Sequence, residues 1–245
     1  MGCRVKMPFW LPIVKSIVFE LKTGGIYMKS IVICLILTGL LTLISCTEKK
    51  ETGGSVTPSE KTDLFNGRDF TGWVRYIPGD SVDVDKVWQV RDGILHCTGV
   101  PKGYIRTESD FFNYRLHVEW RWDEEPGNSG VLLHMQEPDT VWPKAIEAQL
   151  KSGNAGDFYV MGGTNINERQ DPENRRIPKR TESSELPAGE WNSYDILCSE
   201  DTITLIVNDI VQNIATGATV KSGKICLQSE GKPIQFRNIY IEPLR

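Results

Sequence analysis

Residues 115–122, RLHVEWRW, alternate strictly between polar and apolar side chains. This period of two is typical of a β-strand that buries one face and exposes the other. The alternation recurs with Gly, Asn, Asp and Pro between the runs, most clearly at residues 145–150, 202–207, 225–228 and 234–241. No long helical period competes with it. Many short strands with this punctuation predict an all-β fold, a sandwich or jelly roll of two antiparallel sheets.

Composition and charge narrow the class of protein. The chain has 245 residues, of which 40% are hydrophobic and 24% are charged, as in an ordinary globular protein. A β-domain of about 200 residues buries a sizeable core without disulfides or metals. The net charge of −4 is weak, and the Lys and Arg residues form no stripe. We therefore expect no nucleic-acid partner.

An export signal is predicted near the N-terminus. Met28 and Lys29 precede an apolar run at residues 31–44, which ends at Ser45 and Cys46. A charged start, an apolar core too short for a comfortable membrane span and a small residue at the cut site are typical of a signal peptide. Cys46 resembles the lipidated cysteine of bacterial lipoproteins. An ordinary secreted protein with an incidental cysteine is the alternative.

These features divide the chain into three parts. Residues 1–45 are interpreted as an over-extended start followed by the signal peptide, with Met28 as the expected true start. Residues 46–62 hold the lipidated Cys46 and a tether rich in Lys, Glu, Gly, Ser and Thr, and residues 63–245 form the β-domain. We expect an exported protein anchored by lipid to the membrane of the cell envelope, in the periplasm or at the outer-membrane surface.

Two further features concern the domain itself. Cys97, Cys198 and Cys226 lie in strand-like runs, so we expect buried thiols, with one disulfide as the alternative. Residues 151–190 contain many Gly, Pro and charged residues and are interpreted as a long loop over one face of the sandwich. Such loops are either binding loops or insertions without a function, and the sequence leaves both open.

Seven short motifs occur in an order that resembles one protein family. They are LFNGRDFTGW at 64–73, WQVRDGIL at 88–95, EWR at 119–121, GNSGV at 127–131, IEAQ at 146–149, GEWN at 189–192 and FRNI at 236–239. In this order they are similar to the 3-keto-disaccharide hydrolase family. Members often have a histidine after the Leu-Gln strand, where this chain has Ser229-Glu230-Gly231.

The resemblance implies both a fold and a chemistry. The fold is a concanavalin-like jelly roll, and the substrates are glycosides or disaccharides whose sugar carries a ketone at carbon 3. The C2 proton of such a sugar is acidic, so a base can remove it while an electrophile holds the enolate and the aglycone leaves. Two other functions stay open: a non-catalytic glycan-binding lipoprotein, and a glycosidase that uses two carboxylates.

Alternation also predicts which polar side chains gather on one face. If Leu116, Val118 and Trp120 enter the core, His117, Glu119 and Arg121 lie opposite, and Glu147 and Gln149 likewise face away from their apolar neighbours. The same rule puts His134 with Leu132, Gln228 with Cys226, and Asn238 and Tyr240 with Ile234 and Phe236. We expect the polar residues to form the floor of a sugar cleft, with Glu147, Glu119, Arg121 and His134 as catalytic candidates. A solvated face with cross-strand charges is the alternative.

The remaining candidates would bind substrate or a metal. Several aromatic residues could stack on a sugar ring: Trp73, Trp88, Trp142, Tyr104 and Tyr159. Trp142 is the favoured one, since it lies in a loop-like stretch. Asn128, in the turn before Gly130, joins Gln149, Gln228 and Glu230 as candidate sugar-binding residues. One divalent metal ion could polarise the ketone, held by His117, His134, Glu119 and Glu147. This metal site requires the strands of these four residues to lie side by side. Histidines that only make structural hydrogen bonds are the alternative.

Overall fold

The computed structural model describes residues 54–79 and 82–244. The predicted signal peptide and Cys46 lie outside these residues. No helix in the described ranges is both long and apolar enough to cross a membrane.

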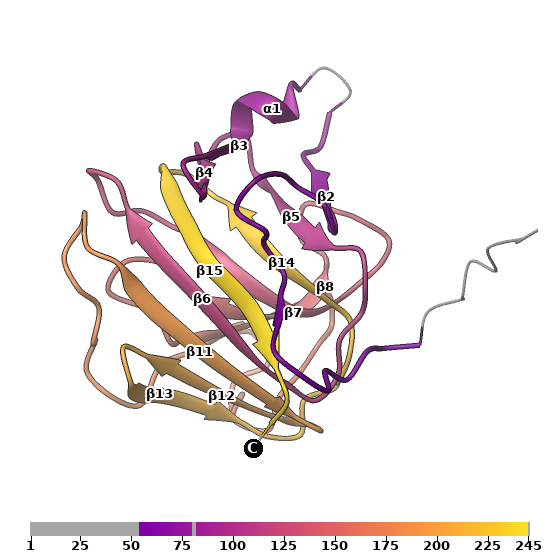
Figure 1. The fold of residues 1–245 in the computed structure, drawn as a ribbon. Helices are drawn as coiled ribbons and strands as arrows, with labels where there is room; N and C mark the ends of the chain where they lie inside the picture. Colours follow the sequence, from indigo (N-terminus) through magenta and orange to yellow (C-terminus); the bar gives the residue numbers. More distant parts are fainter. Residues whose placement is uncertain (1–53, 80–81, 245) are drawn as a thin grey trace, which may run out of the picture. The chain divides into compact units, whose positions relative to one another are not determined.

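Two antiparallel sheets form the domain, as the alternation predicted (Figure 1). One, named here the β6 sheet, has the order β13-β12-β11-β6-β15-β4-β3, with β1 paired to β15; the other, the β8 sheet, has the order β10-β9-β8-β7-β14-β5-β2. The strands are β1 (Thr62–Asp63), β2 (Trp73–Tyr76), β3 (Trp88–Arg91), β4 (Ile94–Cys97), β5 (Gly103–Thr107), β6 (Tyr114–Trp122), β7 (Gly130–Gln136), β8 (Lys144–Gln149), β9 (Phe158–Met161), β10 (Arg176–Ile177), β11 (Asn192–Ser199), β12 (Thr202–Val207), β13 (Ile210–Ala215), β14 (Lys224–Ser229) and β15 (Ile234–Glu242), and α1 (Val84–Val87) is a single turn.

The core lies between the sheets, where the alternating apolar residues meet. Leu116, Val118 and Trp120 of β6 are fully buried, as are Ile146 and Ala148 of β8, and all five belong to one apolar cluster. Burial of a side chain of this size contributes about 1.5–3 kcal/mol, so this pattern fixes which face of each strand points inward. The predicted all-β jelly roll is therefore confirmed.

Two irregularities correct the expected faces of β7 and β15. His134 has a positive φ of 55° within a register shift of β7, and its ring packs edge-on against the core residue Tyr114. Asn238 has a φ of 49° within a register shift of β15, after which Ile239 and Ile241 enter the core. Because one extra residue in a bulge reverses the alternation, His134 does not share a face with Leu132, and Tyr240 does not share one with Phe236.

The boundaries of two other segments differ from expectation. Residues 151–190 are not a structureless loop, because β9 and β10 within them extend the β8 sheet. Within the expected tether at 46–62, Val56 pairs with Phe111 and Pro58 is buried, so this part of it packs against the domain. Cys97, Cys198 and Cys226 are buried free thiols, as the favoured interpretation predicted.

Candidate functional site

The outer face of the β8 sheet is partly covered by its own loop. Arg106 of β5 donates through Nε to Asp139 Oδ1 at 2.8 Å and through Nη2 to Asp139 Oδ2 at 2.9 Å, and the Tyr104 hydroxyl donates to the same carboxylate at 2.9 Å. This bidentate ion pair between Arg106 and Asp139 holds the loop between β7 and β8 against the sheet. Beneath it lies a second, smaller apolar cluster that includes Leu132 and Met161. The sheet therefore has a rigid rim on one side of its outer face.

Beside this rim is a pocket of about 210 Å³, named here the Glu147 pocket. Five residues of the predicted site line it: Asn128, Trp142, Glu147, Gln149 and Glu230. Tyr159, an aromatic that the sequence offered for stacking, lines it too, together with Lys151, Met161 and Arg175, which the sequence analysis did not single out.

Gly130 brings Gln228 next to Glu147, which lines this pocket. β7 runs between β8 and β14, and a Cβ at Gly130 would lie 2.3 Å from Glu147 Oε1 and 2.6 Å from Gln228 Oε1. Only glycine leaves room for both side chains to lean over the middle strand. Glu147 is 4% exposed and Gln228 is 2% exposed. The convergence therefore depends on one missing methyl group.

Three buried oxygens in this region have no partner among the described residues. They are Glu147 Oε1, Gln228 Oε1 and Asn128 Oδ1. An unsatisfied buried polar group costs about 1–3 kcal/mol, so native structures rarely keep one without a reason. A ligand with several hydroxyl groups would supply the missing hydrogen bonds.

Burial gives Glu147 an unusual protonation state. Desolvation raises its pKa from 4.5 to about 8, the charge of Glu230 acts in the same direction, and Arg175 opposes it. At neutral pH the Glu147 carboxyl is therefore mostly protonated and can donate a hydrogen bond or a proton. A strongly perturbed carboxyl in a pocket is a candidate for chemistry.

Glu230 is the second carboxylate of the pocket, and a different environment holds it. The backbone of Asn128 pairs with Glu230 in an isolated bridge, which fixes the chain next to the pocket. Lys102 Nζ lies 3.2 Å from Glu230 Oε1 and 5.1 Å from the centroid of the Trp142 ring. Trp142 is 45% exposed, so its ring remains open to a ligand. The pocket thus combines a neutral acid, an ion-paired carboxylate and an aromatic surface.

Gln149 also has a structural role, which the alternation of polar and apolar residues in the sequence did not predict. Its Oε1 accepts hydrogen bonds from the backbone N–H groups of Leu150 and Lys151, at 2.9 and 2.8 Å. These bonds shape the chain as it leaves β8. Gln149 therefore lines the pocket while its oxygen is already engaged.

The predicted catalytic residues of β6 lie on a different sheet from Glu147. His117, Glu119 and Arg121 are on β6, and they face outward from the β6 sheet, away from the core that separates it from the β8 sheet. Their partners are cross-strand neighbours: Arg237 Nε donates to Glu119 Oε2 at 2.6 Å, and Arg121 Nε donates to Gln235 Oε1 at 2.7 Å. The prediction of one floor containing Arg121 and Glu147 is therefore wrong, and the cross-strand alternative describes these residues.

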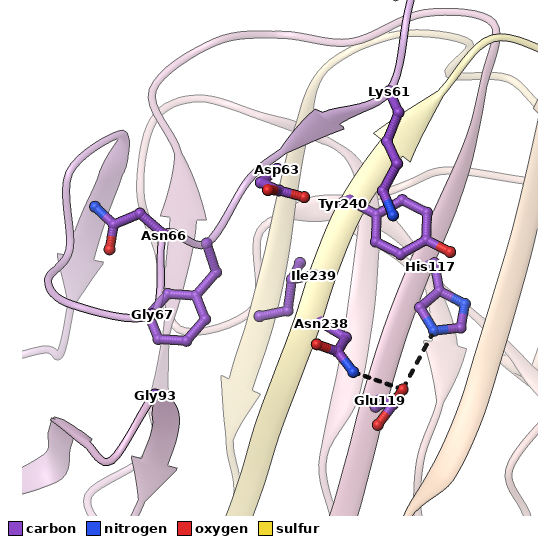
Figure 2. A pocket seen from close by; sticks show the side chains of 11 residues that line it. Lys61, Asp63, Asn66, Gly67, Gly93, His117, Glu119, Asn238, Ile239 and Tyr240 are labelled. Atoms are coloured by element: carbon purple, nitrogen blue, oxygen red, sulfur yellow. Dashed lines mark hydrogen bonds and ion pairs between the residues drawn. The ribbon is translucent and has the colours of Figure 1, made fainter.

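A larger hollow of about 510 Å³ lies on this outer face of the β6 sheet (Figure 2). His117 stacks on Tyr240 with 4.8 Å between ring centroids, and Lys61 Nζ covers the ring at 3.5 Å. Asn238 Nδ2 donates to Glu119 Oε1 at 2.7 Å. Because its aromatic ring is occupied and Glu119 is satisfied, this hollow has less unmet bonding capacity than the Glu147 pocket.

The four predicted metal ligands do not converge. His134 is in the core, where its Nδ1–H donates to the Val220 carbonyl at 3.1 Å, and burial lowers its pKa to about 4. His117 and Glu119 belong to the β6 sheet, while Glu147 belongs to the β8 sheet. Within the described ranges no three His, Cys, Asp or Glu residues are grouped to hold a metal ion. A divalent metal stays a prediction without a ligand set.

Sequence reasoning missed the residues that loops bring to the pocket. Lys151 and Arg175 come from opposite ends of the segment between β8 and β10. Met161 lies two residues after Tyr159 on β9, so the period-two signal could have found it once β9 was recognised. No local pattern predicts that Arg175 lines the pocket, because it is placed there only by the loop between β9 and β10 returning to the sheet.

Comparisons with known proteins agree on the fold. A family model described as a 3-keto-alpha-glucoside-1,2-lyase-like domain matches residues 60–242. A candidate glycosyl hydrolase from Parabacteroides distasonis is 26% identical, with a TM-score of 0.57 over 76% of this chain and 94% of that chain. No curated protein matches the chain.

More distant structures share the fold alone. A β-glucanase from Bacillus licheniformis is 12% identical, with a TM-score of 0.52 over 79% of this chain and 100% of that one. The carbohydrate-binding module CBM66 from Bacillus subtilis is 10% identical, with a TM-score of 0.52 over 70% and 95%. The jelly roll is thus one that carbohydrate-active proteins use.

Proposed function

Because the chain belongs to the family of 3-keto-alpha-glucoside-1,2-lyase-like domains, we propose that it cleaves glycosides whose sugar carries a ketone at carbon 3, in the Glu147 pocket. The ketone acidifies the proton on carbon 2, so a carboxylate is a strong enough base to remove it. The aglycone on carbon 1 can then leave by elimination. The observation that best supports the proposal is that Glu147 Oε1 and Gln228 Oε1 converge over Gly130. Both atoms are buried and have no hydrogen-bond partner among the described residues.

The two carboxyl groups of the pocket take different roles in this proposal. Two titratable groups in contrasting environments suit one acid and one base. Glu230, ion-paired with Lys102, is the base. Glu147, whose pKa burial raises to about 8, is the hydrogen-bond donor to the ketone oxygen. Such a donor stabilises the negative charge that develops on that oxygen as the C2 proton leaves.

The elimination balances without any other reactant. Glu230 takes the C2 proton, and the electron pair of the C–H bond forms the enolate. The enolate then forms the C1=C2 double bond, and the C1–O bond breaks with its electron pair on the aglycone oxygen. Protonated Glu230 returns its proton to that oxygen and is a carboxylate again. Addition of water to the unsaturated sugar would complete a net hydrolysis.

Other residues of the pocket would bind the sugar. The Asn128 and Gln228 side chains offer acceptors for hydroxyl groups, and Trp142 offers an exposed ring for stacking. An exposed aromatic ring suits the apolar face of a pyranose. These contacts would hold carbon 2 near Glu230.

A pair of substrates tests the proposal. The protein is incubated with a 3-keto-glucoside and with the unoxidised parent glucoside, and release of the aglycone is measured. We expect release from the keto form alone, and slower release when carbon 2 carries deuterium. Release from both substrates without an isotope effect would indicate a two-carboxylate glycosidase. Binding without release would indicate a glycan-binding protein.

Variants then test the two roles. Glu230→Gln should abolish turnover because the base is lost, and Glu147→Gln should lower it because an amide is a weaker donor than a carboxylic acid. Glu119→Gln, on the other sheet, is the matched control and should retain activity. For the unmodified protein, kcat should fall as the pH rises through about 8, since Glu147 then loses its proton. Loss of activity on chelation would add a metal ion to this scheme.

We further propose that the domain works outside the cytoplasm, anchored through a lipidated Cys46. The support is the order of charged start, apolar run, small residue and cysteine at residues 28–46. Two acyl chains would give stable anchoring, whereas one chain binds a membrane only marginally.

A further inference from the structure

Two cationic side chains of the Glu147 pocket have no acidic partner. Lys151 and Arg175 line the pocket and are exposed, and neither forms an ion pair within residues 54–79 and 82–244. The neighbouring Arg176 contrasts with them, because its Nε lies 2.7 Å from Asp157 Oδ2. Of these two adjacent arginines, Arg176 is therefore ion-paired and Arg175 is available to a ligand.

The charges around the pocket do not cancel. Glu230 is the only carboxylate of the pocket other than Glu147, and Lys102 already pairs with it. Glu147 is buried and mostly neutral at neutral pH, so it does not offset the remaining cations. Lys151 and Arg175 thus leave about two positive charges facing any bound ligand. A field of one sign in a cleft raises the local concentration of ligands of the opposite sign.

We propose that the glycoside bound in the Glu147 pocket carries a carboxylate, which Lys151 and Arg175 hold while the keto sugar lies against Glu147 and Gln228. This inference rests on the proposed function, because it names the substrate class of the same site. Arginine suits a carboxylate because its planar group donates two parallel hydrogen bonds. The carboxylate can belong to the aglycone or to carbon 6 of the sugar, and both sources present the same group to the two cations.

Matched substrates measure the preference. The full chain is given the 3-keto-glucosides of 4-hydroxybenzoate and of 4-hydroxybenzamide, which differ in the charge of the aglycone. A second pair, 3-keto-glucuronide and 3-keto-glucoside with the same neutral aglycone, places the charge on carbon 6. We expect kcat/KM to be about fourfold to twenty-fivefold higher for the anionic member of one pair, since each of the two exposed ion pairs contributes about two- to fivefold. The preference should shrink in 1 M salt.

Variants assign the preference to the two cations. Arg175→Gln and Lys151→Gln should each reduce the ratio of anionic to neutral kcat/KM by about two- to fivefold, and the double variant should bring it near one. Arg91→Gln, at an exposed arginine of β3 on the other sheet, should leave the ratio unchanged. An equal loss of kcat for both members of a pair would overturn the inference, because the cations would then serve the enolate instead.

A binding measurement separates this inference from the proposed function. Calorimetric titration of the Glu147→Gln variant with the unoxidised parents of both pairs needs no turnover. If the protein cleaves no keto-glycoside yet binds an anionic parent more tightly through Lys151 and Arg175, the function fails and the anion preference stands. If keto-glycosides are cleaved with no preference in either pair, the function stands and the inference fails.

Discussion

Glu147→Gln should make the domain more stable at high pH although it removes a group of the candidate site. The folded-state pKa of Glu147 is about 8, against 4.5 for an ordinary glutamate, because the carboxyl is buried. A raised pKa means that the folded state holds a proton that the unfolded chain releases. The contribution to stability is therefore fully present below pH 4.5 and is lost as the pH rises through 8.

The size of the effect follows from those two pKa values. Between pH 4.5 and 8 the free energy of unfolding falls by about 1.4 kcal/mol per pH unit, which sums to about 5 kcal/mol. The glutamine side chain of the variant would have nearly the same shape and no titration. At pH 8 the variant should therefore be more stable than the unmodified domain by about 3–5 kcal/mol, or roughly 10 °C in Tm. At pH 4.5 the two should agree within about 1 kcal/mol.

Urea denaturation followed by tryptophan fluorescence at pH 4.5, 6.5 and 8 measures this difference on the unit Lys49–Arg245. Burial lowers the pKa of His134 to about 4, so both proteins lose stability as the pH falls below 6.5, and this common loss cancels in the comparison. Parallel stability curves for the two proteins would refute the reasoning, because Glu147 would then not be buried in its neutral form.

Three further predictions concern the packing of the site, its location and the N-terminus. Gly130→Ala should lower turnover about a hundredfold while costing about 1–3 kcal/mol of stability, because the new Cβ meets Glu147 Oε1 at 2.3 Å. Combining it with Glu147→Ala should recover at least about 0.5 kcal/mol by urea denaturation, whereas additive losses would contradict the clash. Arg121→Gln should leave kcat/KM within about twofold, since its Nε contacts Gln235 on the other sheet, and a large loss would return it to the site. Mass spectrometry of protein from the native membrane should find a diacylated Cys46 as the first residue, and an intact Met1 would exclude it.

The architecture could be predicted because burial alternates with a period of two along most strands. In β6 and β12, Leu116, Val118, Ile203 and Leu205 are all fully buried, as their positions indicate. The same rule failed where a strand contains an extra residue. His134 and Asn238 are of residue types that adopt a positive φ more often than most, but neither type requires it, so the sequence did not mark the two shifts. A single shift of this kind moved His134 from the expected cleft into the core.

Only part of the candidate site could be predicted from the alternation of polar and apolar residues. This alternation separates the core face of a strand from its outer face, and it assigned Glu147, Gln228, His117 and Glu119 to outer faces correctly. A sandwich, however, has two outer faces, and only the order of strands in each sheet tells them apart. β6 pairs with β11 and β15, whereas β8 pairs with β7 and β9. The partners of β8 are its neighbours in sequence, but those of β6 are about 80 and 120 residues away, and no local pattern encodes such pairings.

Gly130 carries the information that would have separated the two faces. A glycine at the start of an apolar strand gives up side-chain packing, so it indicates that something else needs the space. Here that space is filled from both neighbouring strands by Glu147 and Gln228, whose oxygens find no protein partner in the described part of the chain. On the β6 sheet the corresponding polar groups are satisfied: Glu119 binds Arg237 and Asn238, and His117 Nδ1 lies 2.8 Å from Asp195 Oδ1. The β6 sheet uses these outer polar residues for its own stability, whereas the β8 sheet leaves Glu147 Oε1 and Gln228 Oε1 available to a ligand.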